Sequence, residues 1–238
     1  HWACFKGLGG VVRGLLERGA RTDLVDEDEE PALHWAVSAD HTEVVHLLLE
    51  ASCQLETENK TGLTALHVAC ERGAEEVVRS LLERGAKTDV VDVEGDTPLD
   101  EAKANSHPAV VCLLLENLIE QEGVDLDRQF RFGWTPLHFA CRFGLDAVVM
   151  KLLERGVNVD LVDEDGDTAL HYAVENKHPA VIDLLLERPV DVSAQNQEGR
   201  TVLQAACFQG DLDLVRKLLA RGARTDLVDR WGDSPLHD

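Results

Sequence analysis

One sequence position recurs along this chain at nearly constant spacing. It is filled in turn by His1, His34, His67, Asp100, His138, His171, Gln204 and His237. The steps between these positions are 33, 33, 33, 38, 33, 33 and 33 residues. A segment of about 33 residues is too small to cover its own apolar face, so the period predicts repeated units that stack on their neighbours.

The unit that contains His67 illustrates the pattern within one period. A short helix is predicted to begin at Thr64 and to be broken by Gly73, and a second helix is predicted over 75–83. The second segment has its apolar residues at the spacing of one helical face, at Val77, Val78, Leu81 and Leu82. Gly85 and Gly95 bracket a polar stretch in which glycine supplies the positive φ of a helix exit and a turn. Each unit is therefore predicted to be helix, turn, helix and protruding hairpin.

The phrase Thr-Pro-Leu-His-x-Ala at 135–140, together with the 33-residue period, resembles the ankyrin repeat. The recurring phrases Leu-Leu-Glu-Arg-Gly-Ala and Asp-x-x-Gly-Asp-Thr extend the resemblance to the whole chain. It implies an all-α solenoid of stacked ankyrin repeats, each a helix-turn-helix with a β-hairpin loop. We expect residues 1–238 to form one elongated, curved domain of about seven units, partial at both ends. Apolar residues at these ends suggest end-to-end stacking with further repeats.

The single 38-residue step places five extra residues in or just after a second helix, around 116–122. At about 1.5 Å per residue, they would lengthen that helix by roughly a turn and a half. The extension either supports the hairpin that follows it or is a tolerated insertion. Elsewhere Asp40, Ser106 and Lys177 replace the glycine between two helices, and Glu29 replaces a hairpin glycine, so that hairpin is expected to be irregular.

Composition limits the possible partners. The formal net charge is −22, with 45 acidic against 23 basic residues. This balance argues against nucleic acid and anionic lipid and favours a protein or peptide partner of basic or mixed charge. Apolar runs are too short for membrane insertion, and four of the six cysteines occupy the same small position in their units. Buried free thiols fit a cytoplasmic location, and a nuclear one is not excluded.

No motif indicates catalysis, a metal or a cofactor. His41 and His46 are five residues apart, whereas the metalloprotease motif needs two histidines four apart on one helix face. The segment 163–167 lacks the glycine and glutamate positions of a calcium loop. In ankyrin repeats the histidine of the repeated position bonds backbone between units, so the resemblance implies a structural role for it. We therefore predict a protein that is not an enzyme.

The segment 130–143 stands out because it contains five aromatic residues in a chain that is only 5% aromatic. The ankyrin resemblance implies binding on a concave face made of hairpin tips and first helices. The residues expected to bind a partner there are Arg131, Phe132, Trp134, Phe139, Arg142, Phe143, Tyr172, Glu175, Arg200 and Phe208. Alternatively, some of these rings fold inward against Phe130 and form a satellite core.

The predicted function is a protein-interaction scaffold. Two other kinds of parent protein remain compatible with the repeats. One is a multidomain ubiquitin ligase resembling the Mind bomb group, in which this chain would recognise the substrate and the catalytic domains would lie outside it. The other is a membrane channel with this chain as its cytosolic arm.

Overall fold

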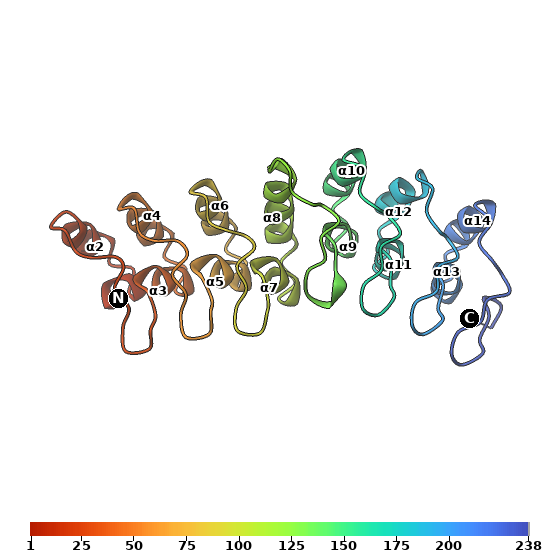
Figure 1. Cartoon of the computed structure of the whole chain (residues 1–238), viewed down its shortest axis with the longest axis horizontal. Helices are drawn as coiled ribbons and strands as arrows, with labels where there is room; N and C mark the ends of the chain where they lie inside the picture. The colour runs from red at the N-terminus through yellow and green to blue at the C-terminus, as the bar shows by residue number, and fades with distance from the viewer. Residues whose placement is uncertain (238) are drawn as a thin grey trace. The chain divides into compact units, whose positions relative to one another are not determined.

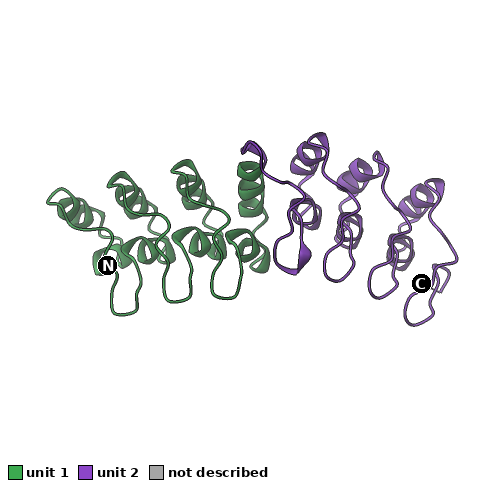
Figure 2. Cartoon of the chain, in the orientation of Figure 1, with its two compact units in different colours: residues 1–118 green, residues 119–238 purple. Residues whose placement is uncertain are grey.

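The computed structural model describes residues 1–237, which form paired helices joined by long loops (Figure 1). The chain divides into two compact units, residues 1–118 and 119–238 (Figure 2). The helices that begin in the first unit are α1 (Trp2–Phe5), α2 (Gly9–Leu16), α3 (Ala32–Ser38), α4 (Thr42–Glu50), α5 (Ala65–Arg72), α6 (Glu75–Glu83), α7 (Pro98–Ala104) and α8 (Pro108–Glu120). The second unit contains the short 3₁₀ helix η1 (Arg131–Gly133), α9 (Pro136–Arg142), α10 (Asp146–Glu154), α11 (Ala169–Glu175), α12 (Pro179–Leu186), α13 (Val202–Gln209) and α14 (Leu212–Ala220).

Within each unit, like helices pack on like. In the first unit α1, α3, α5 and α7 form a row beside the long loops, and α2, α4 and α6 form a second row (Figure 1). In the second unit α9, α11 and α13 pack in succession, and α10 packs on α12. The largest fully buried side chains come from both rows, including Leu66, Leu81, Leu137 and Leu152. The apolar core therefore runs between the rows and from one repeat to the next.

A repeated set of hydrogen bonds joins each first helix to the next loop. In the His67 unit, the Thr64 N–H donates to His67 Nδ1 at 3.1 Å, and His67 Nε2 donates to the Asp96 carbonyl at 3.2 Å. His138 and His171 repeat this arrangement with the carbonyls of Asp167 and Arg200, at 3.1 and 3.3 Å. The histidine at the repeated position thus caps its own helix and holds the following hairpin, which is a structural role.

Two units depart from this network for local reasons. Pro31 stands where other units have threonine, and because it has neither an N–H nor a hydroxyl, His34 Nδ1 is buried without a partner. Asp100 replaces the histidine, and its Oδ2 accepts from the Thr97 N–H and hydroxyl at 3.0 and 2.6 Å. Its Oδ1 is buried and unpartnered, and burial raises the pKa of this carboxyl.

The loops between units are hairpins closed by side chains rather than by strands. In a typical loop the Asp163 Oδ1 accepts from the N–H groups of Asp165 and Asp167, at 3.0 and 2.9 Å. Among the described residues, β pairing is limited to the isolated bridges Val25 to Pro31 and Val162 to Thr168. Glu29 adopts φ 61°, and the Asp26 N–H still donates to the Glu30 carbonyl. The expected irregularity of that hairpin is therefore wrong, because a left-handed glutamate completes the same turn.

Helix α8 has 13 residues, whereas α6 has nine. Leu118 and Ile119 in the added part are buried, and the Ile119 carbonyl accepts from Arg155 Nη1 at 2.7 Å. The added residues thus contribute to packing. No helix within residues 1–237 is long and apolar enough to cross a bilayer.

Candidate partner-binding surface

The aromatic segment of the second unit is largely an internal cluster. The Trp134 ring lies 4.4 Å from the ring of Tyr172 and 5.1 Å from that of Phe139, and Phe139 meets Phe130 at 5.5 Å. Trp134 is 8% exposed and Phe139 is fully buried. The expectation that these two side chains face outward is wrong, because rings on a hairpin stem and on adjacent first helices bury one another in tilted and edge-to-face contacts.

Tyr172 belongs to the same cluster and is only half-buried. Its hydroxyl donates to Asp163 Oδ2 at 2.5 Å, and Asp163 Oδ1 holds the hairpin turn. Burial, followed by the contact with Asp163, raises the pKa of Tyr172. Trp35 in the first unit repeats this arrangement by donating to Asp26 at 2.7 Å. Tyr172 therefore stabilises a loop, and only part of its ring surface is open to a partner.

The tip of the same hairpin is exposed. Phe132 has left-handed φ (59°) and is 49% exposed, with the Arg131 guanidinium 4.9 Å from its ring. Its carbonyl accepts from the Glu164 N–H at 2.9 Å, which ties this tip to the next one. At the end of α9, Arg142 is exposed and donates to Asn176 Oδ1, and Phe143 is half-buried. These four side chains present both apolar and cationic groups.

Three further predicted residues gather in one hollow of the second unit. Glu175, Arg200 and Phe208 line a cavity of about 380 Å³, which we call the Phe208 groove. Burial raises the pKa of Glu175, while the charges of Arg142 and Arg200 oppose that rise. The predicted residues Arg142, Glu175, Arg200 and Phe208 are thus electrostatic or spatial neighbours, although they come from three different repeats.

Two residues outside the predicted set complete this region. Trp231 is 54% exposed, and the guanidinium carbons of Arg200 and Arg230 lie 4.9 and 4.1 Å from its ring. Lys177 also lines the Phe208 groove, with φ 56°. Trp231 occupies a hairpin tip, and Lys177 occupies the glycine position between two helices. These repeat positions are the sequence signal from which both residues could have been predicted.

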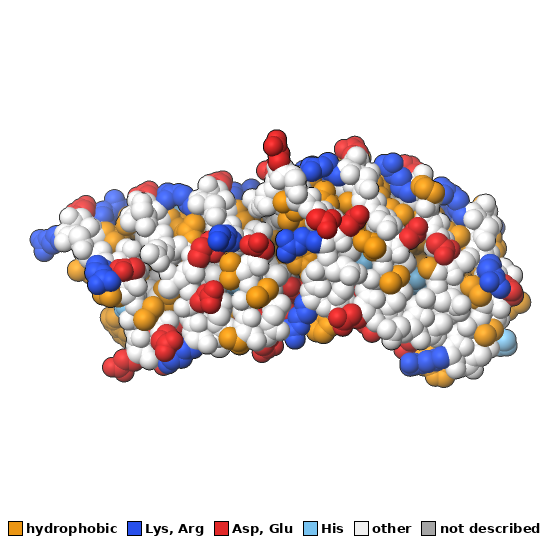
Figure 3. Space-filling view, viewed as in Figure 1, with side chains coloured by type: hydrophobic (Ala, Val, Ile, Leu, Met, Phe, Trp, Pro, Cys, Tyr) orange, Lys and Arg blue, Asp and Glu red, His pale blue; other side chains and the backbone are white. Residues whose placement is uncertain are grey.

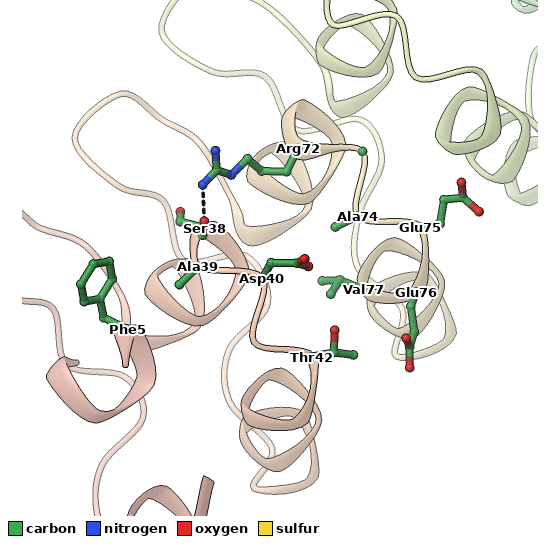
Figure 4. Close-up of a pocket in the computed structure, with 11 residues that line it drawn as sticks. Phe5, Ser38, Ala39, Asp40, Thr42, Arg72, Ala74, Glu75, Glu76 and Val77 are labelled. Atoms are coloured by element: carbon green, nitrogen blue, oxygen red, sulfur yellow. Dashed lines mark hydrogen bonds between the residues drawn. The ribbon is translucent and has the colours of Figure 1, made fainter. Parts of the chain in front are cut away.

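A larger hollow lies in the first unit, between the ends of first helices and the starts of second helices (Figure 4). Its cavity volume is about 770 Å³, and Asp40, Glu75 and Glu76 make it mostly acidic. Arg72 on its edge donates to the Ser38 carbonyl, so that cation is already engaged by its own unit.

Acidic, basic and apolar side chains are intermixed over the face shown in Figure 3.

The first unit also brings three carboxylates together. Asp92, Asp96 and Glu101 place ligand-type oxygen atoms within 4.8 Å of one another. Glu101 occupies the position of Tyr172 and Trp35, so an acid stands where those units have a hydrogen-bond donor to the hairpin Asp. Burial, followed by the charges of Glu71, Asp96, Asp92 and Asp100, raises the pKa of Glu101 to about 7. A protonated Glu101 would restore the missing donor at this position.

Titratable groups elsewhere have structural surroundings. Burial lowers the pKa of His34, His67, His138 and His171, so these histidines are neutral near pH 7. Cys70 and Cys141 are fully buried free thiols whose pKa burial raises, as expected for small core residues. Cys207 is only half-buried.

Paired helices that stack with a protruding loop after each pair define a helical repeat protein. Models of ankyrin repeats in three copies match residues 1–92, 57–122 and 116–196, and a model of many copies matches 184–237. The chain belongs to the ankyrin-repeat family, which confirms the predicted fold class.

A solved structure, the human ASB11 ankyrin repeat domain, resembles this chain with a TM-score of 0.70 and 29% sequence identity. The match covers 94% of this chain and 97% of that one. Comparison with curated proteins finds no match. Ankyrin repeats are generally protein–protein interaction modules.

Proposed function

We propose that this chain is a non-catalytic module that binds a partner protein on the face shared by its hairpin tips and first helices, within the second unit. The supporting observation is the exposure of three large rings, Phe132, Phe208 and Trp231, at hairpin tips or the end of a first helix. Aromatic residues and arginine dominate binding energy when a partner covers them. The cytoplasm is the proposed compartment, since the buried thiols fit a reducing environment.

The binding set differs from the one expected from sequence. Arg131, Phe132, Arg142, Phe143, Glu175, Arg200 and Phe208 remain in it, and Tyr172 contributes its exposed edge. Trp134 and Phe139 act beneath this surface by supporting the hairpin and α9. Removing either ring would therefore weaken binding through loss of folding, as large-to-small changes in a core cost about 3–5 kcal/mol.

A comparative capture experiment tests the proposal. The intact chain, a Phe132→Ala/Arg142→Ala variant and a Met150→Ala variant are each fused to a proximity-labelling enzyme in cells, and the labelled proteins are quantified. Met150 is the matched control because it is an exposed apolar residue on a second helix. We expect a subset of proteins to be labelled by the intact chain and by the Met150 variant but to be lost with the double variant.

Purified partners from that subset then give affinities for the same three proteins. Each hot-spot side chain should contribute about 2 kcal/mol or more to the free energy of binding. Thermal unfolding must show that the double variant is folded. Equal labelling by all three folded proteins would contradict the proposed binding face.

A further inference from the structure

The Phe208 groove has a floor whose polar groups are already paired. His171 Nε2 donates to the Arg200 carbonyl at 3.3 Å, and Gln204 Nε2 donates to the Asp233 carbonyl at 2.7 Å. The Thr201 N–H donates to Gln204 Oε1 at 3.0 Å. Because these floor groups hold the repeats together, selectivity for a ligand has to come from the rim and from Phe208.

Phe208 is more exposed than any other aromatic side chain of the described residues, at 79%. The fold does not require a ring there, because the equivalent position holds Ser38, Glu71, Ala104, Arg142 or Glu175 in other units. The first unit has Phe5 at this position, but that ring packs on Trp35 at 5.2 Å. Phe208 makes no ring contact within residues 1–237. It thus offers an apolar surface that no part of the described chain covers.

The rim carries two cations and one anion. Arg200 lies 3.7 Å from an Asp229 carboxylate oxygen and 3.9 Å from one of Glu198, so its charge is largely compensated. Glu175 lies in a field to which Asp167 and Glu198 contribute as well as Arg142 and Arg200. Lys177 forms no ion pair with any described residue, although the chain contains 45 acidic residues. Lys177 is therefore the cation of the groove that has no acidic partner among the described residues.

The backbone at Lys177 adds to this observation. Lys177 adopts φ 56° at a position where Gly73, Gly144 and Gly210 adopt the same conformation in other units. The left-handed conformation costs a residue with a Cβ about 1–2 kcal/mol relative to glycine. The strained backbone is not itself evidence of a ligand. It does show that a lysine stands at the groove edge, at a position where other repeats have a glycine without a side chain.

We infer that the Phe208 groove binds an extended peptide segment that carries a bulky apolar side chain close to an aspartate or glutamate. The apolar side chain packs on Phe208, and the carboxylate pairs with Lys177 beside the guanidinium of Arg200. This inference rests on the proposed function and assigns the chemistry of one part of the partner. It agrees with the partner of mixed charge that the net charge of −22 favours, because the groove takes the acidic part of such a surface.

Selection from a random dodecapeptide phage library on the intact chain tests the inference without a known partner. Enriched peptides are synthesised with a fluorophore, and their Kd is measured by fluorescence anisotropy against the intact chain. We expect enriched sequences to combine an aromatic or large aliphatic residue with a nearby Asp or Glu. Phe208→Ala and Lys177→Glu should each raise Kd at least tenfold. Higher salt should weaken binding, since the ion pair is at the surface.

A charge exchange makes the test specific to the proposed pair. In the Lys177→Glu protein, replacing the peptide acid by lysine should recover at least tenfold of the lost affinity. Leu212→Ala is the control, because Leu212 is an exposed apolar residue at the start of a second helix. Circular dichroism must show that each variant is folded. We expect this result because Phe208 and Lys177 are both exposed.

Several outcomes would overturn the inference. These are no enriched peptides, enriched basic peptides that respond to Glu175→Gln instead of Lys177→Glu, or a concentration-dependent dimer that Phe208→Ala abolishes. If peptides bind and lose affinity with Phe132→Ala/Arg142→Ala but not with Phe208→Ala, the groove assignment fails while the proposed function stands. If cellular partners of the intact chain are insensitive to every one of these variants, the proposed function fails as well.

Discussion

His67 and Gln204 occupy the same position in their repeats and make the same two contacts. His67 accepts from the Thr64 N–H and donates to the Asp96 carbonyl, and Gln204 accepts from the Thr201 N–H and donates to the Asp233 carbonyl. The difference is that only the imidazole titrates near neutral pH. Gln204 therefore shows that glutamine can replace the histidine at this position and keep both hydrogen bonds.

His67→Gln should make stability less dependent on pH. Burial lowers the pKa of His67 below its ordinary 6.5, so the unfolded chain binds the proton first as pH falls. The stability that neutral His67 contributes is present above 6.5 and is lost below it. Urea unfolding at pH 7.5 and 5.5 should show a smaller loss for His67→Gln, by at most about 1.4 kcal/mol per pH unit.

Glu101 makes the free energy of unfolding depend on pH in the opposite direction, but its contribution cancels when the intact chain is compared with His67→Gln. Its pKa is raised to about 7, so its stabilising protonated form is lost as pH rises from about 4.5 through 7. Because Glu101 is present in both proteins, the difference between them isolates His67. Equal pH dependence of the two proteins would contradict the assignment of a depressed His67 pKa.

At the scale of elements, the turn between the two helices of one repeat packs against the corresponding turn of the next repeat. Gly73 ends α5 with φ 68°, and a Cβ there would lie 2.6 Å from His107 Nδ1. His107 Nε2 in turn donates to the Glu71 carbonyl at 2.9 Å. The pairs Gly7 with His41 and Gly144 with His178 repeat this arrangement. The glycine positions are evident in the sequence, but their histidine partners are not, because the two residues of each pair are 34 apart and belong to different repeats.

Gly73→Ala should destabilise the protein by more than about 2 kcal/mol, because the backbone cost of positive φ adds to the overlap with His107. In a His107→Ala background the same change should cost only about 1–2 kcal/mol. Gly85→Ala is the control for backbone strain, since Gly85 has φ 84° and open space around its Cβ position. Chemical unfolding of the four proteins of the cycle and of Gly85→Ala gives the coupling energy, and additive effects would refute the pairing.

For the whole molecule, the relevant quantity is the charge of −22 on 238 residues. Like charges repel more in the compact state than in the unfolded chain, and added salt screens this repulsion. The ion pairs at the surface, such as Arg216 with Asp213, are exposed and worth little.

We therefore expect the unfolding temperature to rise by a few degrees between 20 and 300 mM NaCl, which corresponds to about 1 kcal/mol. Differential scanning calorimetry measures it, with sucrose of equal osmolality as the control. A fall with salt would mean that attractive pairs dominate.

The 33-residue period by itself determined the helix pairs and the hairpin loops, because each depends on residues within one unit or at a fixed offset. The structural role of the histidine at the repeated position followed from the resemblance to ankyrin repeats. Only the tertiary structure decided which variable side chains are exposed. Trp134 and Phe132 lie two residues apart on one hairpin, yet Trp134 packs on Tyr172 of the next repeat while Phe132 stays exposed. A repeat pattern marks both positions as variable, but exposure is set by the ring that the neighbouring repeat happens to supply.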